Sequence, residues 1–175
     1  AAILLRIGIG CARLIGASIQ GIRYQVVVAV RGRAAAAVRI RHAAGRSLWT
    51  NVLWIENAVA KFAALRDIVG KEGDIGIDFH GAVPPATAKI LMKELEQFQP
   101  FFYEEIINCQ EVNLMAEMAK QTHIPIATGE RIFTKWGFRE ILEKGTATIL
   151  QPDLCHAGGI SEVKIIAGMA EAYYA

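Results

Sequence analysis

Acidic side chains recur at a regular spacing through the second half of the chain. Asp78, Glu104 and Glu130 each follow a short apolar run at intervals of 26 residues, and Asp153 comes 23 residues later. Three carboxylates that converge without nearby lysines raise one another's pKa unless a divalent cation neutralises them. Oxygen ligands of this kind suit Mg²⁺. The spacing predicts a magnesium site, against the simpler alternative that acidic residues end strands because loops are polar.

Histidines near these carboxylates are candidates for proton transfer. His80 follows Asp78 by two residues, so on an extended chain the two side chains point to the same side. A histidine beside a metal and a substrate pocket is a natural general acid or base. His156 follows Asp153 closely and is a weaker candidate, whereas His123 precedes a predicted strand and has a structural interpretation.

The elements that must position these side chains alternate between helix and strand. Apolar residues at helical spacing predict helices, and short apolar runs closed by Gly, Pro or acidic residues predict strands. The predicted helices are 52–69, 87–98, 112–120, one containing 138–143 and one after Gly159; the predicted strands are 22–30, 38–41, 75–79, 101–103, 124–127 and 147–150. From residue 52 onward this order indicates βαβ units with a parallel sheet, as a (β/α) barrel or an open doubly wound sheet. In both, ligands bind at the carboxyl edge of the strands.

Composition limits the class of protein. The 175 residues (19.1 kDa) are 53% hydrophobic and 21% charged with a net charge of +2, which excludes a wholly disordered chain. No long uncharged apolar run predicts a membrane span, so no membrane partner is expected. Three widely spaced cysteines fit reduced thiols and a cytoplasmic protein. Residues 1–50 carry eight arginines without Lys, Asp or Glu, but without interleaved aromatic residues we expect no nucleic-acid partner.

Four segments resemble one family closely. They are Ile77–Gly81, Tyr103–Glu105, Ile124–Arg131 and Gln151–Ile160. The sequence over about residues 52–175 resembles the enolase superfamily, in its mandelate racemase and muconate lactonizing branch, and is most similar to acid-sugar dehydratases of the galactonate dehydratase type. The resemblance implies a (β/α)8 TIM-type barrel, here incomplete with about six strands, without its last strands and most of the N-terminal capping domain. Residues 1–21 would be a remnant of the capping domain, and residues 22–175 a partial barrel.

The resemblance also implies a role for each site residue. Asp78, Glu104 and Glu130 would bind one Mg²⁺ that holds the carboxylate of an acid sugar. His80 would be the general acid that protonates the departing 3-hydroxyl, and Asp153 would orient a catalytic histidine carried by the next strand. Further expected contacts to substrate come from Arg39 and Arg41, which occupy roughly the place of a Lys-x-Lys pair in racemase relatives, and from Glu105, Arg131 and His156.

Other functions fit the same scaffold. A racemase or epimerase would need a second base, and arginine at residues 39 and 41 is a poor one because it stays protonated. A non-catalytic partial barrel is the other alternative, since no histidine follows His156. We therefore expect Mg²⁺ binding with little dehydration from these residues alone. The open edges of a six-stranded barrel favour a homo-oligomer.

Overall fold

A six-stranded sheet organises the part of the chain that the structure describes. The computed structural model describes residues 21–30, 33–42 and 52–175, so all but the last residue of the predicted capping-domain remnant lies outside the described residues. The strand order is β2-β1-β3-β4-β5-β6. The strands are β1 (Gly21–Val30), β2 (Arg33–His42), β3 (Gly73–Asp78), β4 (Phe102–Glu104), β5 (Ile126–Thr128) and β6 (Ile149–Leu150).

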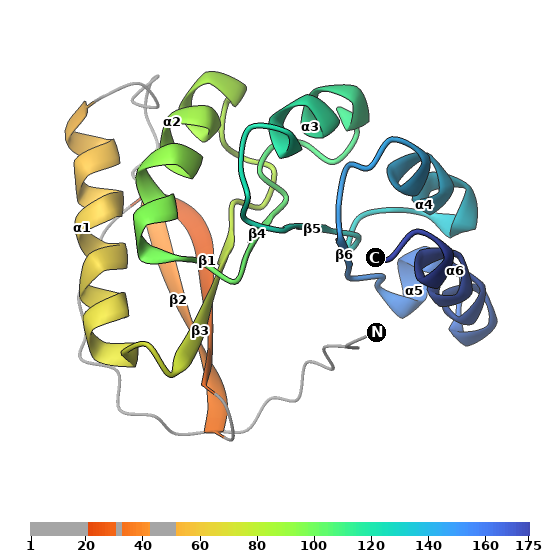
Figure 1. The fold of residues 1–175 in the computed structure, drawn as a ribbon, viewed down its shortest axis with the longest axis horizontal. Helices are drawn as coiled ribbons and strands as arrows, with labels where there is room; N and C mark the ends of the chain where they lie inside the picture. The colour runs from red at the N-terminus through yellow and green to blue at the C-terminus, as the bar shows by residue number, and fades with distance from the viewer. Residues whose placement is uncertain (1–20, 31–32, 43–51) are drawn as a thin grey trace.

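Helices connect the strands from β3 onward. They are α1 (Val52–Val69), α2 (Pro85–Leu95) with the 3₁₀ turn η1 (Glu96–Phe98), α3 (Val112–Ala119), α4 (Thr134–Glu143), α5 (Leu154–Ala157) and α6 (Ile160–Ala172). Strands β3 to β6 pair in parallel. Figure 1 shows them along the inner side of an arc with the helices outside. The predicted alternation of helix and parallel strand is confirmed.

The first two strands differ from the expected βα pattern. Strand β1 pairs antiparallel with both β2 and β3, so β1 runs against the other strands of the sheet. Only residues 31 and 32 separate β1 from β2. Because a parallel connection needs a crossover of a dozen residues or so, strands joined this closely must form a hairpin. The sequence predicts two strands at 22–30 and 38–41 without giving their direction, and the structure shows that they form an antiparallel hairpin.

The core lies between the parallel strands and the helices packed on them. Ile75, Ile77 and Tyr103 of the strands are buried with Leu91 of α2 and Met115 of α3. The hydroxyl of Tyr103 donates a hydrogen bond of 2.7 Å to the backbone oxygen of Met92, which satisfies the one polar atom of this large ring. A core this well covered fixes the strands, and hence the residues at their carboxyl ends.

No helix within the described residues is both long and apolar enough to cross a membrane.

Candidate active site

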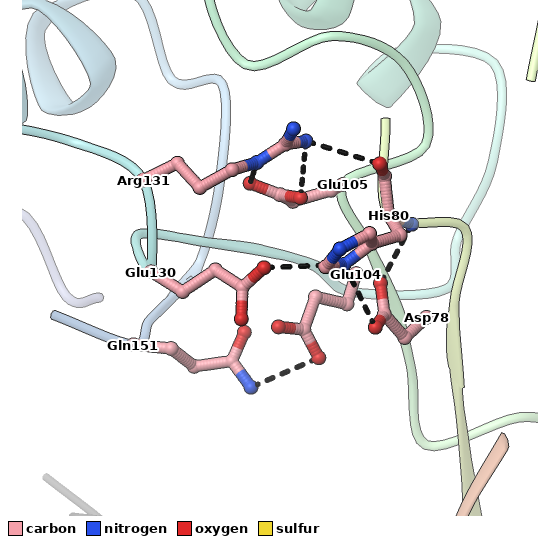
Figure 2. Close-up of polar contacts among 7 residues, drawn as sticks. All are labelled: Asp78, His80, Glu104, Glu105, Glu130, Arg131 and Gln151. Atoms are coloured by element: carbon pink, nitrogen blue, oxygen red, sulfur yellow. Dashed lines mark hydrogen bonds and ion pairs between the residues drawn. The ribbon is translucent and has the colours of Figure 1, made fainter. Parts of the chain in front are cut away.

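The carboxyl ends of three consecutive strands bring the predicted carboxylates together. Asp78 ends β3 and pairs in the parallel ladder with Glu104, the last residue of β4, which pairs in turn with Ala127 of β5. Glu130 lies two residues beyond the end of β5. Figure 2 shows the side chains of Asp78, Glu104 and Glu130 gathered in one place with His80. The strand-end rule that the sequence suggested therefore holds for these three carboxylates.

A glycine sets the path of the chain to Glu130. Gly129 has a φ of 146°, in the region that favours glycine, and a Cβ there would lie 2.8 Å from the backbone of Gln151. The backbone N–H of Gln151 donates to the oxygen of Thr128 at 2.9 Å, which continues the pairing of β5 and β6 past their ends. The chain therefore reaches Glu130 through a close approach of the backbone at Gly129 to that at Gln151, and a side chain at position 129 would disrupt this approach.

Two of these carboxylates are buried without a lysine or arginine partner among the side chains that the structure describes. Asp78 is 5% exposed and Glu104 is 8% exposed. Within the described ranges, no lysine or arginine forms an ion pair with either of them. Burial raises the pKa of Asp78 to about 6, against an opposing effect of His80. Burial, followed by the charge of Asp78, raises the pKa of Glu104 to about 8.

His80 lies between carboxylates from two strands. Its Nδ1 is 3.4 Å from Oδ2 of Asp78 and 3.2 Å from Oε1 of Glu130, as the dashed lines of Figure 2 mark. The backbone N–H of His80 also donates to Oδ1 of Asp78 at 2.6 Å. The imidazole side chain is half exposed. Two oxygens beside Nδ1 favour a proton on that nitrogen, so Nε2 is the ring atom left for another partner.

Glu105 and Arg131 form a bidentate ion pair beside this histidine. Arg131 donates from Nε to Oε1 of Glu105 at 3.0 Å and from Nη2 to Oε2 at 2.5 Å. Glu105 is fully buried. The pKa of Arg131 is raised, chiefly by its hydrogen bonds to Glu105. Both residues were predicted to touch substrate, and the contacts described here are with each other and with the backbone of His80.

The donor set fits a hard cation such as Mg²⁺. One possible metal-ligand group is Asp78, His80 and Glu105, whose ligand atoms lie within 4.8 Å of one another. This group differs from the predicted set of Asp78, Glu104 and Glu130. We favour the predicted set, because both oxygens of Glu105 already bind Arg131, whereas no lysine or arginine side chain that the structure describes pairs with the buried Glu104. Carboxylate oxygens are also the donors that Mg²⁺ prefers.

Asp153 and His156, two further predicted site residues, make contacts outside the group formed by Asp78, His80, Glu104 and Glu130. Asp153 is exposed and caps α5, where its Oδ1 accepts from the backbone N–H groups of Cys155 and His156; the bond from His156 is the main cause that lowers the pKa of Asp153. The ring of His156 stacks on Phe133, with ring centroids 5.1 Å apart. The predicted role of Asp153 in orienting a histidine of the next strand and the predicted contact of His156 with substrate stay predictions.

The two arginines lie on β2. Arg39 pairs with Gln25 of β1, and Gln25 pairs with Asp78 of β3, so Arg39 is level with Asp78 two strands away. Arg41 lies two residues further along β2. Their side chains lie outside the described part of the structure, so their expected contacts with substrate stay predictions.

Gln151 is a site residue to which sequence reasoning gave no role. Its Nε2 donates to Oε2 of Glu104 at 3.3 Å, an interaction that opposes the rise in the pKa of Glu104. The signal was present, because Gln151 directly follows β6 and so obeys the same strand-end rule as the carboxylates.

A comparison with models of protein families identifies the family of this chain. Residues 24–175 match the family model described as enolase C-terminal domain-like. The chain belongs to the enolase C-terminal domain-like family.

Solved structures of the enolase superfamily share this fold. A member from Salmonella Typhimurium is 35% identical, with a TM-score of 0.69 over 71% of this chain and 32% of that chain. A candidate dehydratase from Zymomonas mobilis ZM4 is 37% identical, with a TM-score of 0.69 over 74% of this chain and 32% of that one. The 3,6-anhydro-D-galactonate cycloisomerase from Zobellia galactanivorans is 34% identical, with a TM-score of 0.65 over 68% and 34% of the two chains. The chain thus spans about a third of the length of these relatives.

Proposed function

We propose that this enolase-family chain carries the metal-binding and proton-donating part of an acid-sugar dehydratase site. In the proposed reaction, the proton α to a carboxylate is removed and the β-hydroxyl leaves as water. The observation that supports this proposal is the meeting of Asp78, Glu104 and Glu130 around His80 at the carboxyl edge of the sheet. The candidate dehydratase among the similar structures supports the same reaction class.

Asp78, Glu104 and Glu130 would hold the Mg²⁺ ion. When bound, the ion supplies positive charge beside the substrate carboxylate and so stabilises the negative charge that develops as the α-proton leaves. The buried carboxyl of Glu104 must lose its proton to bind the ion, because burial holds its pKa near 8. Gln151 would keep Glu104 oriented for this role through its hydrogen bond at Oε2.

His80 in its imidazolium form would donate the proton that the departing hydroxyl needs from Nε2, and would be left neutral with its other proton on Nδ1. With Nδ1 directed at Asp78 and Glu130, the ring is oriented by two acceptors, and its half-exposed side chain leaves Nε2 accessible to substrate. A hydroxyl leaves as water only when it gains a proton, so an acid at this position lowers the barrier to elimination. By the family resemblance, Asp153 would orient the histidine that removes the α-proton.

Titration calorimetry with Mg²⁺ tests the metal site in the chain. We expect binding by the wild-type chain, loss of binding in D78N, and unchanged binding in D74N. Asp74 is the matched control because it is an exposed carboxylate on the same strand β3. Binding that persists in D78N would contradict the metal assignment.

A second assay tests the reaction. D-galactonate and related aldonates are incubated with Mg²⁺ in D₂O, and loss of water and exchange of the α-proton are followed by NMR. We expect little dehydration by this chain alone, and dehydration by a version extended by two βα units, which His80→Ala removes while Mg²⁺ binding remains. Exchange of the α-proton without loss of water would instead indicate a racemase or epimerase, and turnover that survives His80→Ala would refute the role of His80.

A further inference from the structure

We infer that Glu105 and Arg131 are a positioning pair that fixes the conformation of His80. This inference rests on the proposed function, because the orientation of His80 matters for dehydration only if His80 is the acid. It assigns to both residues a role different from the substrate contacts expected from the sequence. The inference is carried by hydrogen bonds that connect the pair to the backbone of the segment that holds His80.

The first connection runs through the backbone of Glu105. Glu105 directly follows β4, and its N–H donates to the oxygen of Ala127 in β5 at 2.9 Å. Its own backbone oxygen accepts from the N–H of Gly81 at 2.8 Å. The residue after His80 is therefore tied to the end of the neighbouring strand.

The second connection runs through the guanidinium of Arg131. Besides its two bonds to Glu105, Nη2 donates to the backbone oxygen of His80 at 3.1 Å, as Figure 2 shows. The planar guanidinium can make these bonds at once because its donors are held in a fixed geometry. One side chain thus links the buried carboxylate of Glu105 to the peptide group of the histidine.

The backbone of His80 needs this support. Its φ is 54°, a left-handed conformation that costs free energy in a residue with a Cβ and persists only where the surroundings impose it. Asp78 binds the N–H of His80 on one side, and Arg131 binds its oxygen on the other. Gly81 has a φ of 58°, and a Cβ there would overlap the guanidinium of Arg131, so the segment is packed directly against the pair.

The alternative role for Arg131 is to bind the carboxylate of a substrate through its partly exposed side chain. The two roles differ in what they require of the free protein. A positioning pair holds the amides of His80 and Gly81 in the absence of any ligand, whereas a substrate-binding arginine leaves them unaffected. Amide hydrogen exchange in the metal-free chain separates the two.

The test compares Arg131→Met with wild type by NMR-detected amide exchange. Losing a hydrogen bond to a charged group should speed the exchange of the His80 and Gly81 amides by about tenfold or more. Arg131→Lys, which can keep one bond, should give a smaller increase. The matched control Arg139→Met removes an arginine that pairs with Glu143 on the exposed face of α4, and should change neither amide.

Two results would overturn the inference. One is exchange of both amides that stays within about twofold of wild type in Arg131→Met. The other is an equal increase at the buried amides of β3, which would mean that the pair stabilises only the fold as a whole. If Arg131→Met does not fold, the double variant Glu105→Gln/Arg131→Met removes the unpaired buried charge and is judged by the same two criteria. Since no Mg²⁺ is present, failure of this test is distinct from failure of the Mg²⁺ titration.

Discussion

The buried carboxyl of Glu104 makes the metal-free protein less stable as the pH rises. Burial and the charge of Asp78 raise its pKa from 4.5 to about 8, so the folded state holds a proton that the unfolded state has lost between these values. The free energy of unfolding therefore falls with pH across this window and levels off above it. A shift of this size corresponds to on the order of 3 to 5 kcal/mol, a large part of the stability of a typical domain.

Glu104→Gln removes this titration while nearly keeping the shape of the side chain. Urea unfolding followed by circular dichroism at pH 5, 6, 7 and 8 in the presence of a chelator should give a steep decline for wild type and a shallower one for the variant. At pH 8 the variant should be the more stable by on the order of 3 kcal/mol. Added Mg²⁺ should stabilise wild type at pH 8 and leave the variant nearly unchanged, because only the ionised carboxylate gains from a cation.

Glu140→Gln is the control for a general effect of removing a charge. Glu140 is half exposed and pairs with Lys144 one helical turn away, so its removal should leave the pH dependence unchanged. Equal pH slopes for wild type and Glu104→Gln would refute the reasoning, since they would mean that Glu104 is ionised in the folded protein throughout this range.

Two further substitutions test the packing that supports the site. Gly81→Ala should destabilise the protein by about 1 to 3 kcal/mol more than Gly70→Ala in urea unfolding, because both glycines have positive φ but only the Cβ at residue 81 meets the Arg131 guanidinium. Equal losses would show that the clash is relieved without cost. Tyr103→Phe should cost about 0.5 to 1.5 kcal/mol by the same measurement, because it removes one buried hydrogen bond to the oxygen of Met92, which keeps its bond from the N–H of Glu96; an unchanged midpoint would contradict this.

Most of the parallel half of the fold could be predicted from the sequence, because its elements differ in apolar period and are separated by Gly or Pro. The helix predicted at 52–69 has the same bounds as α1. The hairpin was harder to predict. The prediction began the second strand at residue 38 whereas β2 begins at Arg33, since Ala34 to Ala37 are strong helix formers that only pairing with β1 holds extended. With β2 predicted to begin too late, the sequence did not reveal how short the link between β1 and β2 is, and it is this short link that requires antiparallel pairing.

The site, like the fold, contains residues that could be predicted from the sequence and residues that could not. Asp78, Glu104 and Glu130 could be predicted because the end of a strand is a position that sequence reveals, and parallel pairing brings such positions together. The distinct environment of Glu105 could not be predicted, because it depends on burial and on an arginine 26 residues away. The cap that Asp153 provides to α5 was missed because a four-residue helix shows no apolar period, although Asp before a helix is a common cap.

Because Glu104 and Glu105 are adjacent, evolution can accept few insertions or deletions that shift β4 along β3. Neighbouring acidic residues have separate tasks here, one hydrogen-bonded to Gln151 and one to Arg131. Strand β4 has only three residues, so it cannot absorb an inserted or deleted residue by sliding along β3. A slip of one position would put Tyr103 or Glu105 where Glu104 belongs. Insertions and deletions should therefore be tolerated in the turns at the opposite edge of the sheet only when they leave this pairing in place.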